Sequence, residues 1–233
     1  MTSRMPKFLD RRKICIICEG AEEYEYLERL NTLNVWNEQY KVILDNADGN
    51  GNIPARYQDR YQNSSYDLVL VFCDTEKKPY EQYVDIKRKI NEFHGVDNVA
   101  DSVIIYGNPC TMQIILQHWC EEKLKTPSKK VNSSLIQQCT GVENYKGRAD
   151  QRKQIMEQIT LENFGEMKER IKQMENDDRI IGSSNFARFI EFLTNEDDGW
   201  IEKINTLLDT VLVAIDEFGM KCDRDIITVL VIN

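Results

Sequence analysis

The sequence predicts an α/β protein built on a parallel sheet with flanking helices and a mostly helical C-terminal extension. The first observation is a pair of continuous apolar runs, 14–18 and 68–73, each bounded by polar residues. Such runs are typical of strands buried on both faces of a parallel sheet. The second observation is that a segment with helical spacing follows each run, so that strands and helices alternate. The third is that both runs end in acid, with Glu19 after the first and Asp74 and Glu76 after the second.

The alternation of strands and helices continues through the first 125 residues. After the first strand, apolar residues spaced three to four apart predict a helix over 21–30, and its early acids suit a helix N-terminus. Right-handed crossovers would join the strands into a doubly wound sheet. The remaining elements are expected to be a strand at 41–44, a polar turn at 45–52, a helix at 53–61, a strand at 67–73, a helix from Pro79 to Phe93, a strand at 102–106 and a helix at 112–119.

The character of the chain changes after Lys125, where Pro127 and Ser128 break the pattern. We therefore expect two units: an α/β domain over 1–125, and a helical extension over 126–233 that packs on it. Within the extension we expect helices at 150–174, 185–193 and 200–218, and a final strand at 225–232.

Composition indicates a soluble protein of the cytoplasm. No apolar run approaches the ~20 residues of a membrane helix, and no apolar signal core follows the N-terminus. The seven cysteines are an odd number and scattered, which favours reduced thiols over a disulfide scaffold. Cys15 and Cys18 form a CxxC, but they would face opposite sides of a strand and no second pair follows. Five cysteines lie in apolar runs, where we expect small buried hydrophobes: Cys15, Cys18, Cys73, Cys110 and Cys120.

The net charge of -9 argues against a general coat of positive charge for nucleic acid. One segment, 123–153, is nevertheless basic, with eight Lys or Arg residues against two acids. This segment either contacts phosphate or is a solvated loop and helix face. The residues that we expect to contact phosphate are Lys129, Lys130, Lys146 and Arg148.

The acidic residues at the strand ends predict a metal site. The carboxyl ends of parallel strands meet at one sheet edge, where ligands bind in open α/β sheets. Carboxylates gathered there repel one another unless a cation lies between them, and their hard oxygens favour Mg²⁺ or Mn²⁺. Glu19, Asp74 and Glu76 are therefore the expected metal ligands and catalytic residues. The alternative is that these acids only cap helices at the strand ends.

Several other residues are candidates for the same edge of the sheet. Gly20 would allow a tight turn and close approach of a substrate, and Asn108 follows the last strand. Asn108 either contacts substrate or, with Pro109, forms a turn that starts a helix. His118 is expected to be a packed residue rather than a metal ligand, and His94 to lie at a helix end.

These motifs resemble the RloB family. The resemblance rests on three stretches: Cys18-Glu19-Gly20 followed by acids and Tyr26, then Phe72-x-Asp74-x-Glu76, then Asn108-Pro109-Cys110 before an apolar helix. It covers roughly residues 12–125. RloB proteins are Toprim-type proteins of bacterial defence loci, related to the AbiLii abortive-infection component. The resemblance therefore implies a Toprim-like parallel sheet for the α/β domain over 1–125.

The resemblance implies a magnesium-dependent nuclease acting on DNA or RNA. Glu19 matches the Toprim glutamate that assists proton transfer or holds a metal, and Asp74 matches the first acid of the DxD pair. Glu76 stands where an aspartate is usual, which puts a second metal site in doubt. The alternative is a non-catalytic scaffold or sensor that works with a partner ATPase, because this chain has no Walker A pattern. A homo-oligomer is left open.

Overall fold

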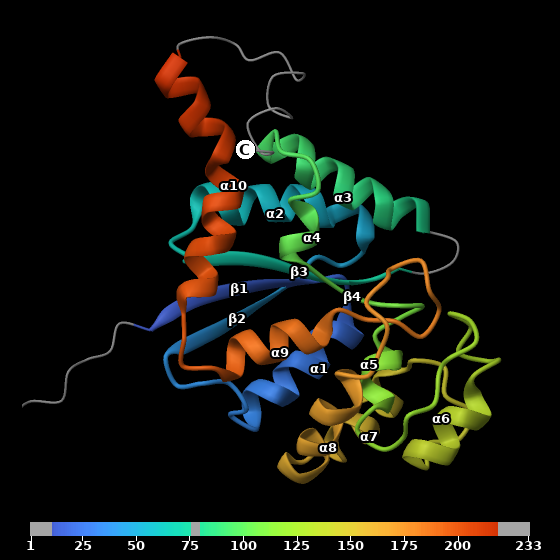
Figure 1. Cartoon of the computed structure of the whole chain (residues 1–233). Coiled ribbons are helices and arrows are strands. Elements are labelled where there is room, and N and C mark those ends of the chain that lie inside the picture. Colours follow the sequence, from blue (N-terminus) through green and yellow to red (C-terminus); the bar gives the residue numbers. More distant parts are fainter. Residues whose placement is uncertain (1–10, 76–79, 219–233) are drawn as a thin grey trace, which may run out of the picture.

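The computed structural model describes residues 11–75 and 80–218. It confirms the predicted fold class, because one sheet of four parallel strands carries helices on both faces (Figure 1). β3 is buried throughout and β1 from Ile14 onward, as their continuous apolar runs predict. The strands, in the spatial order β2-β1-β3-β4, are β1 (Arg12–Cys18), β2 (Tyr40–Asn46), β3 (Leu68–Asp74) and β4 (Ile104–Gly107).

The helices of the first half pack on the two faces of the sheet. Helices α2 and α3 cover one face, and α1 lies on the other (Figure 1). The expected strand at 102–106 is wrong at its start, because residues 100–103 form a short helix. The elements are α1 (Ala21–Thr32), the 3-10 helix η1 (Asn50–Asn52), α2 (Ile53–Asn63), α3 (Tyr80–His94), α4 (Ala100–Val103) and α5 (Met112–Leu116).

The described part of the extension, 126–218, is mostly helical, as expected. The single helix expected at 150–174 is two helices, because Thr160 starts a new one: its hydroxyl accepts a hydrogen bond from the Asn163 amide at 3.3 Å. In the described segments, no helix has both the length and the apolarity needed to cross a membrane. The expected strand at 225–232 lies outside the described residues. The helices are α6 (Ser133–Thr140), α7 (Ala149–Glu157), α8 (Leu161–Ile171), α9 (Phe186–Thr194) and α10 (Gly199–Phe218).

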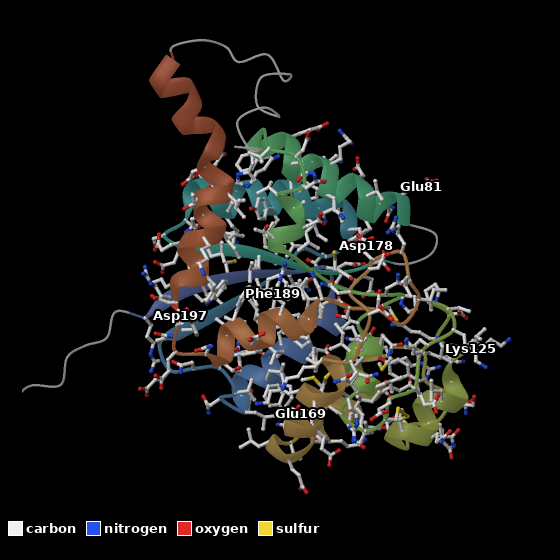
Figure 2. The ribbon with its side chains drawn as sticks, viewed as in Figure 1. Glu81, Lys125, Glu169, Asp178, Phe189 and Asp197 are labelled. Atoms are coloured by element: carbon white, nitrogen blue, oxygen red, sulfur yellow. A yellow bond between two sulfur atoms is a disulfide. The ribbon has the colours of Figure 1, made fainter. Side chains whose placement is uncertain are left out.

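The extension closes the β4 edge of the sheet. The Asn185 side chain accepts a hydrogen bond from Tyr106 N at 2.9 Å and donates one to Ile104 O at 2.7 Å, in the place of a further strand. Ser184 Oγ donates to Tyr106 O at 2.6 Å. Figure 2 shows Phe189 between α9 and the sheet, where its side chain is fully buried. The edge is thus covered by side chains, which protects it from pairing with another chain.

One cysteine expectation is wrong. Cys120 and Cys139 form a disulfide between the turn after α5 and helix α6, with their Cα atoms 6.3 Å apart. The sequence gives no sign of it, since α6 was not predicted and only its packing on α5 brings the two together. Burial raises the pKa of the Cys15 thiol to about 12, so this thiol is inert. The other four described cysteines are free and buried, as expected: Cys15, Cys18, Cys73 and Cys110.

Candidate functional site

Two of the predicted acids meet at the carboxyl edge of the sheet. β1 and β3 are neighbours, with Cys18 opposite Phe72, so the residues after them lie side by side. Glu19 N donates to Phe72 O at 2.9 Å, which extends the strand pairing by one residue. Glu19 Oε2 then accepts a hydrogen bond from Asp74 N at 2.8 Å. The parallel pairing of two buried strands therefore brings Glu19 and Asp74 together.

Asp74 is held by a residue that sequence reasoning missed. Its Oδ1 atom accepts hydrogen bonds from Thr111 N at 2.6 Å and from Thr111 Oγ1 at 2.9 Å. Thr111 comes this close because Gly107 ends β4 opposite Asp74 and the chain then turns back against it. A Cβ atom at Gly107 would lie 2.8 Å from Cys110 O, so this approach requires glycine.

Helix α1 adds two further acids, Glu22 and Glu23, in its first turn. Glu23 Oε2 accepts a hydrogen bond from Gly20 N at 3.0 Å and so caps the helix. Gly20 itself has an extended backbone (φ -154°), which any residue adopts, so its conformation does not require glycine. Close approach of a substrate to Gly20 stays a prediction. Glu23 is 4% exposed and Asp74 is 8% exposed. The site therefore consists of four acids: Glu19, Glu22, Glu23 and Asp74, which we call the carboxylate cluster.

The carboxylate cluster contains buried negative charge. Burial, and then the charges of Glu23, Glu19 and Glu22, raise the pKa of Asp74 well above its usual value. Burial and then Glu22 raise the pKa of Glu23, against the opposing effect of hydrogen bonds from Thr111 and Gly20. Within the described part of the chain, neither Asp74 nor Glu23 forms an ion pair. Such a cluster favours a bound proton or a bound cation.

Lys129 brings the basic segment to the carboxylate cluster. Its Nζ lies 3.3 Å from Glu22 Oε2, and the Tyr145 hydroxyl donates to the other oxygen of Glu22. Gly147 has a left-handed backbone (φ +72°), and a Cβ there would lie 2.5 Å from Lys129 Nζ. The loop that carries Gly147 therefore lies against Lys129. Three more of the predicted phosphate contacts, Lys130, Lys146 and Arg148, are exposed.

The basic segment is not uniformly available to a ligand. Arg152 forms an ion pair with Glu25 at 2.7 Å and donates to Gly147 O at 2.6 Å, so its charge is used within the protein. Lys125 lies on the outer surface beside α6 (Figure 2). The segment thus divides into residues at the carboxylate cluster and residues remote from it.

The carboxylate cluster suits a metal in its chemistry. It offers only carboxylate oxygens, the ligands preferred by Mg²⁺ and Mn²⁺, and it holds buried charge that a cation would offset. Over 11–75 and 80–218, no three His, Cys, Asp or Glu side chains form a ready-made metal group. Glu76, the third predicted ligand, lies outside the described residues. Glu19 and Asp74 are thus the two predicted ligands whose placement is known.

The remaining candidates have structural partners. Asn108 Nδ2 donates to Asp178 O at 2.6 Å, so its side chain anchors the loop before α9. His118 is fully buried, with Nε2 3.2 Å from Tyr26 OH and Nδ1 3.1 Å from Asn163 Oδ1. Burial lowers its pKa to about 4. His94 ends α3 and lies 3.0 Å from Tyr57 OH.

Fold and site together define an α/β protein with a carboxylate cluster at the carboxyl edge of a parallel sheet. No model of a protein family, no curated protein and no solved structure matches this chain. The likeness to RloB and other Toprim proteins therefore stays a prediction from the motifs.

Proposed function

We propose that this protein cleaves phosphodiester bonds in nucleic acid with the help of Mg²⁺ or Mn²⁺, as part of bacterial defence. The observation that supports the proposal is the burial of Asp74 and Glu23 beside Glu19 and Glu22, with no ion pair to either buried acid in the described part of the chain. A fold gains no stability from gathering like charges in this way, so such groups are typical of functional sites.

In this proposal Glu19 and Asp74 hold the metal, with Glu76 as the third ligand by the family pattern. A bound divalent ion neutralises charge that develops on phosphate oxygens. Thr111 fixes the direction of the Asp74 carboxylate through two hydrogen bonds, which keeps one ligand in place without the metal. Glu19 is the base that the resemblance implies. Burial raises the pKa of Glu23, which suits its carboxylate to take up or release a proton.

The proposed substrate is a DNA or RNA strand held through its phosphates. Lys129 lies at the carboxylate cluster, and its neighbour Gly147 connects two exposed cations, Lys146 and Arg148. The rest of the chain is acidic and repels nucleic acid, so that binding would be local and sensitive to salt.

The decisive experiment incubates pure protein with labelled single- and double-stranded DNA and RNA in Mg²⁺, Mn²⁺ or EDTA. We expect cleavage with metal, none in EDTA, and none for Asp74→Ala. Asp97→Ala removes an exposed aspartate elsewhere and should cleave normally. Glu76→Asp restores the usual family residue and should cleave at least as well. Unchanged cleavage by Asp74→Ala would place the activity in another site or in a contaminant.

A non-catalytic scaffold that serves a partner ATPase is the second candidate. It is favoured by the internal partners of two cluster acids: Lys129 and Tyr145 bind Glu22, and Glu19 accepts a main-chain hydrogen bond. In this case no nucleic acid would be cut under any metal, and metal would not change the melting temperature.

A further inference from the structure

A hollow lies beside the edge strand β4, between α3, the loop before α9, and α9 itself. Its volume is about 410 Å³, within the range of small-molecule sites. Three cationic side chains from these three segments line it: Lys87, Arg179 and Arg188. The convergence of cations from separate elements indicates a site for a charged ligand.

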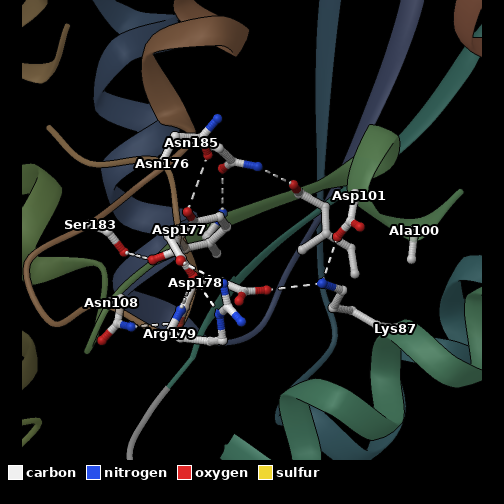
Figure 3. A network of polar contacts seen from close by, with 12 residues as sticks. Lys87, Ala100, Asp101, Asn108, Asn176, Asp177, Asp178, Arg179, Ser183 and Asn185 are labelled. Carbon is white, nitrogen blue, oxygen red and sulfur yellow. Dashed lines mark hydrogen bonds and ion pairs between the residues drawn. The ribbon is translucent and has the colours of Figure 1, made fainter. Parts of the chain in front are cut away.

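Two of these cations are held by aspartates. Lys87 Nζ lies 2.6 Å from Asp101 Oδ1 and 2.9 Å from Asp178 Oδ2. Arg179 pairs with Asp177 at 2.8 Å. Figure 3 shows this network of Lys87, Asp101, Asp177, Asp178 and Arg179 at the wall of the hollow. The wall is therefore fixed before any ligand binds.

Arg188 differs from the other two cations. Among residues 11–75 and 80–218 it forms no ion pair, and its Nε atom is buried without a hydrogen-bond partner. One of its terminal nitrogens donates to Asp101 O at 2.8 Å. A half-buried guanidinium without an ion pair is costly, and its terminal N–H groups line a hollow in which an acceptor can bind. A phosphate group binds a guanidinium well, because its oxygens accept from two N–H groups at once.

The aspartates restrict what else the ligand can be. The carboxylates of Asp101, Asp177 and Asp178 line the same hollow and repel a ligand that carries several phosphate groups. They accept hydrogen bonds, so they favour a ligand that also carries N–H groups. A single phosphate at one end and N–H donors at the other are the features of a nucleotide.

We propose that this hollow binds one nucleotide, with its phosphate on Arg188 and the N–H groups of its base toward Asp177 and Asp178. The inference goes beyond the proposed function and does not depend on it. The nucleotide is either free or one unit of a strand that reaches the carboxylate cluster. The topology supports the second source, because β4 lines the hollow with Tyr106 and pairs with Asp74 through Gly107.

Calorimetry on the full chain in EDTA, with adenosine monophosphate as the probe, tests the proposal. We expect binding below millimolar concentration, and binding at least about tenfold weaker for adenosine, which lacks the phosphate. Arg188→Gln should weaken binding by about tenfold or more, and Arg188→Lys by less. Arg56→Gln, an arginine of α2 outside the hollow, should bind as the natural protein does. No binding at millimolar probe, or equal binding by a folded Arg188→Gln, would overturn the proposal.

A second measurement covers the case in which Arg188→Gln does not fold. In the natural protein, adenosine monophosphate should protect Arg188 from modification by phenylglyoxal, as read by mass spectrometry, and absence of protection would overturn the site. Asp74→Ala should bind the probe normally even where cleavage is lost, which separates this proposal from the nuclease. A single-stranded oligonucleotide that protects Arg188 identifies the strand as the source, and protection by the mononucleotide alone identifies the free nucleotide.

Discussion

Asp74→Asn should make the metal-free protein more stable at neutral pH. The asparagine oxygen can still accept both hydrogen bonds from Thr111, so the local geometry is kept. The change removes one negative charge from a buried group that Glu19, Glu22 and Glu23 surround. The substitution should therefore relieve the repulsion between this position and the neighbouring carboxylates, and so stabilise the fold.

The sign of this effect follows from the raised pKa of Asp74. Because its folded-state pKa is raised above the unfolded value, the folded protein binds the extra proton, and stability falls as pH rises through the folded pKa. Asparagine does not titrate, so its advantage should be absent at acid pH and should grow as pH rises from the unfolded-state pKa toward the folded-state pKa of Asp74. We expect a gain of about 1–2 kcal/mol at pH 7. For a chain of this length, that is a rise in melting temperature of roughly 2–8 °C.

Thermal and urea unfolding of both proteins, between pH 4 and pH 8 with EDTA or Mg²⁺, measures this difference. Magnesium should stabilise the natural protein, by about 2.7 kcal/mol at a concentration one hundred times its dissociation constant. The variant should respond little. The reasoning would be refuted by a variant that is less stable than the natural protein at pH 7, or that gains as much stability from Mg²⁺. The first result would contradict the repulsion among the carboxylates, and the second would contradict Asp74 as a metal ligand.

Three further predictions test other parts of the structure. Gly107→Ala should lower the free energy of unfolding, measured in urea, by about 1–3 kcal/mol and should reduce cleavage, because the added Cβ would clash with Cys110 O and displace Thr111. Unchanged stability and cleavage would contradict the close approach of Cys110 to Gly107. Below pH 6.5 His118 is protonated in the unfolded chain but not in the folded protein, where its pKa is about 4. The free energy of unfolding should therefore fall by up to about 3 kcal/mol by pH 4. His118→Gln should remove that part of the pH dependence. A variant whose stability depends on pH as that of the natural protein does would contradict this role of His118. A variant with serine at four basic positions should bind nucleic acid with a flatter slope of log affinity against log salt, by roughly 0.7–0.9 per lost phosphate contact. An unchanged slope would exclude the basic segment from the nucleic-acid interface. The four positions are Lys129, Lys130, Lys146 and Arg148.

Much of the sheet could be predicted from the sequence because its strands carry their signal locally. The runs at 14–18 and 68–73 are apolar on both faces, and this pattern occurs in few settings other than a central parallel strand. Once these strands are neighbours, the positions of Glu19 and Asp74 follow from the chain direction alone. The edge strand β4 starts two residues later than expected, because residues 100–103 form helix α4.

The rest of the site depends on contacts between residues far apart in the chain. Thr111 reaches Asp74 only because Gly107 permits a close turn, and Lys129 and Tyr145 reach Glu22 across more than 100 residues. No local spacing in the sequence signals these contacts. The one available signal was the pair Glu22 and Glu23 in the first turn of α1, which fits helix capping equally well.

The capping interpretation accounts for part of the carboxylate cluster. Glu23 caps α1 through Gly20 N, and Asp74 binds Thr111 N just before α5. Capping explains why each acid has a hydrogen-bond donor, but it needs neither deep burial nor four carboxylates together, since exposed Ser, Thr, Asn or Asp caps serve as well. Burial raises the pKa of both acids, and in the described part of the chain neither has a cation in contact. The capping bonds hold the carboxylates in fixed positions. The negative charge of these carboxylates is what a bound Mg²⁺ or Mn²⁺ would offset.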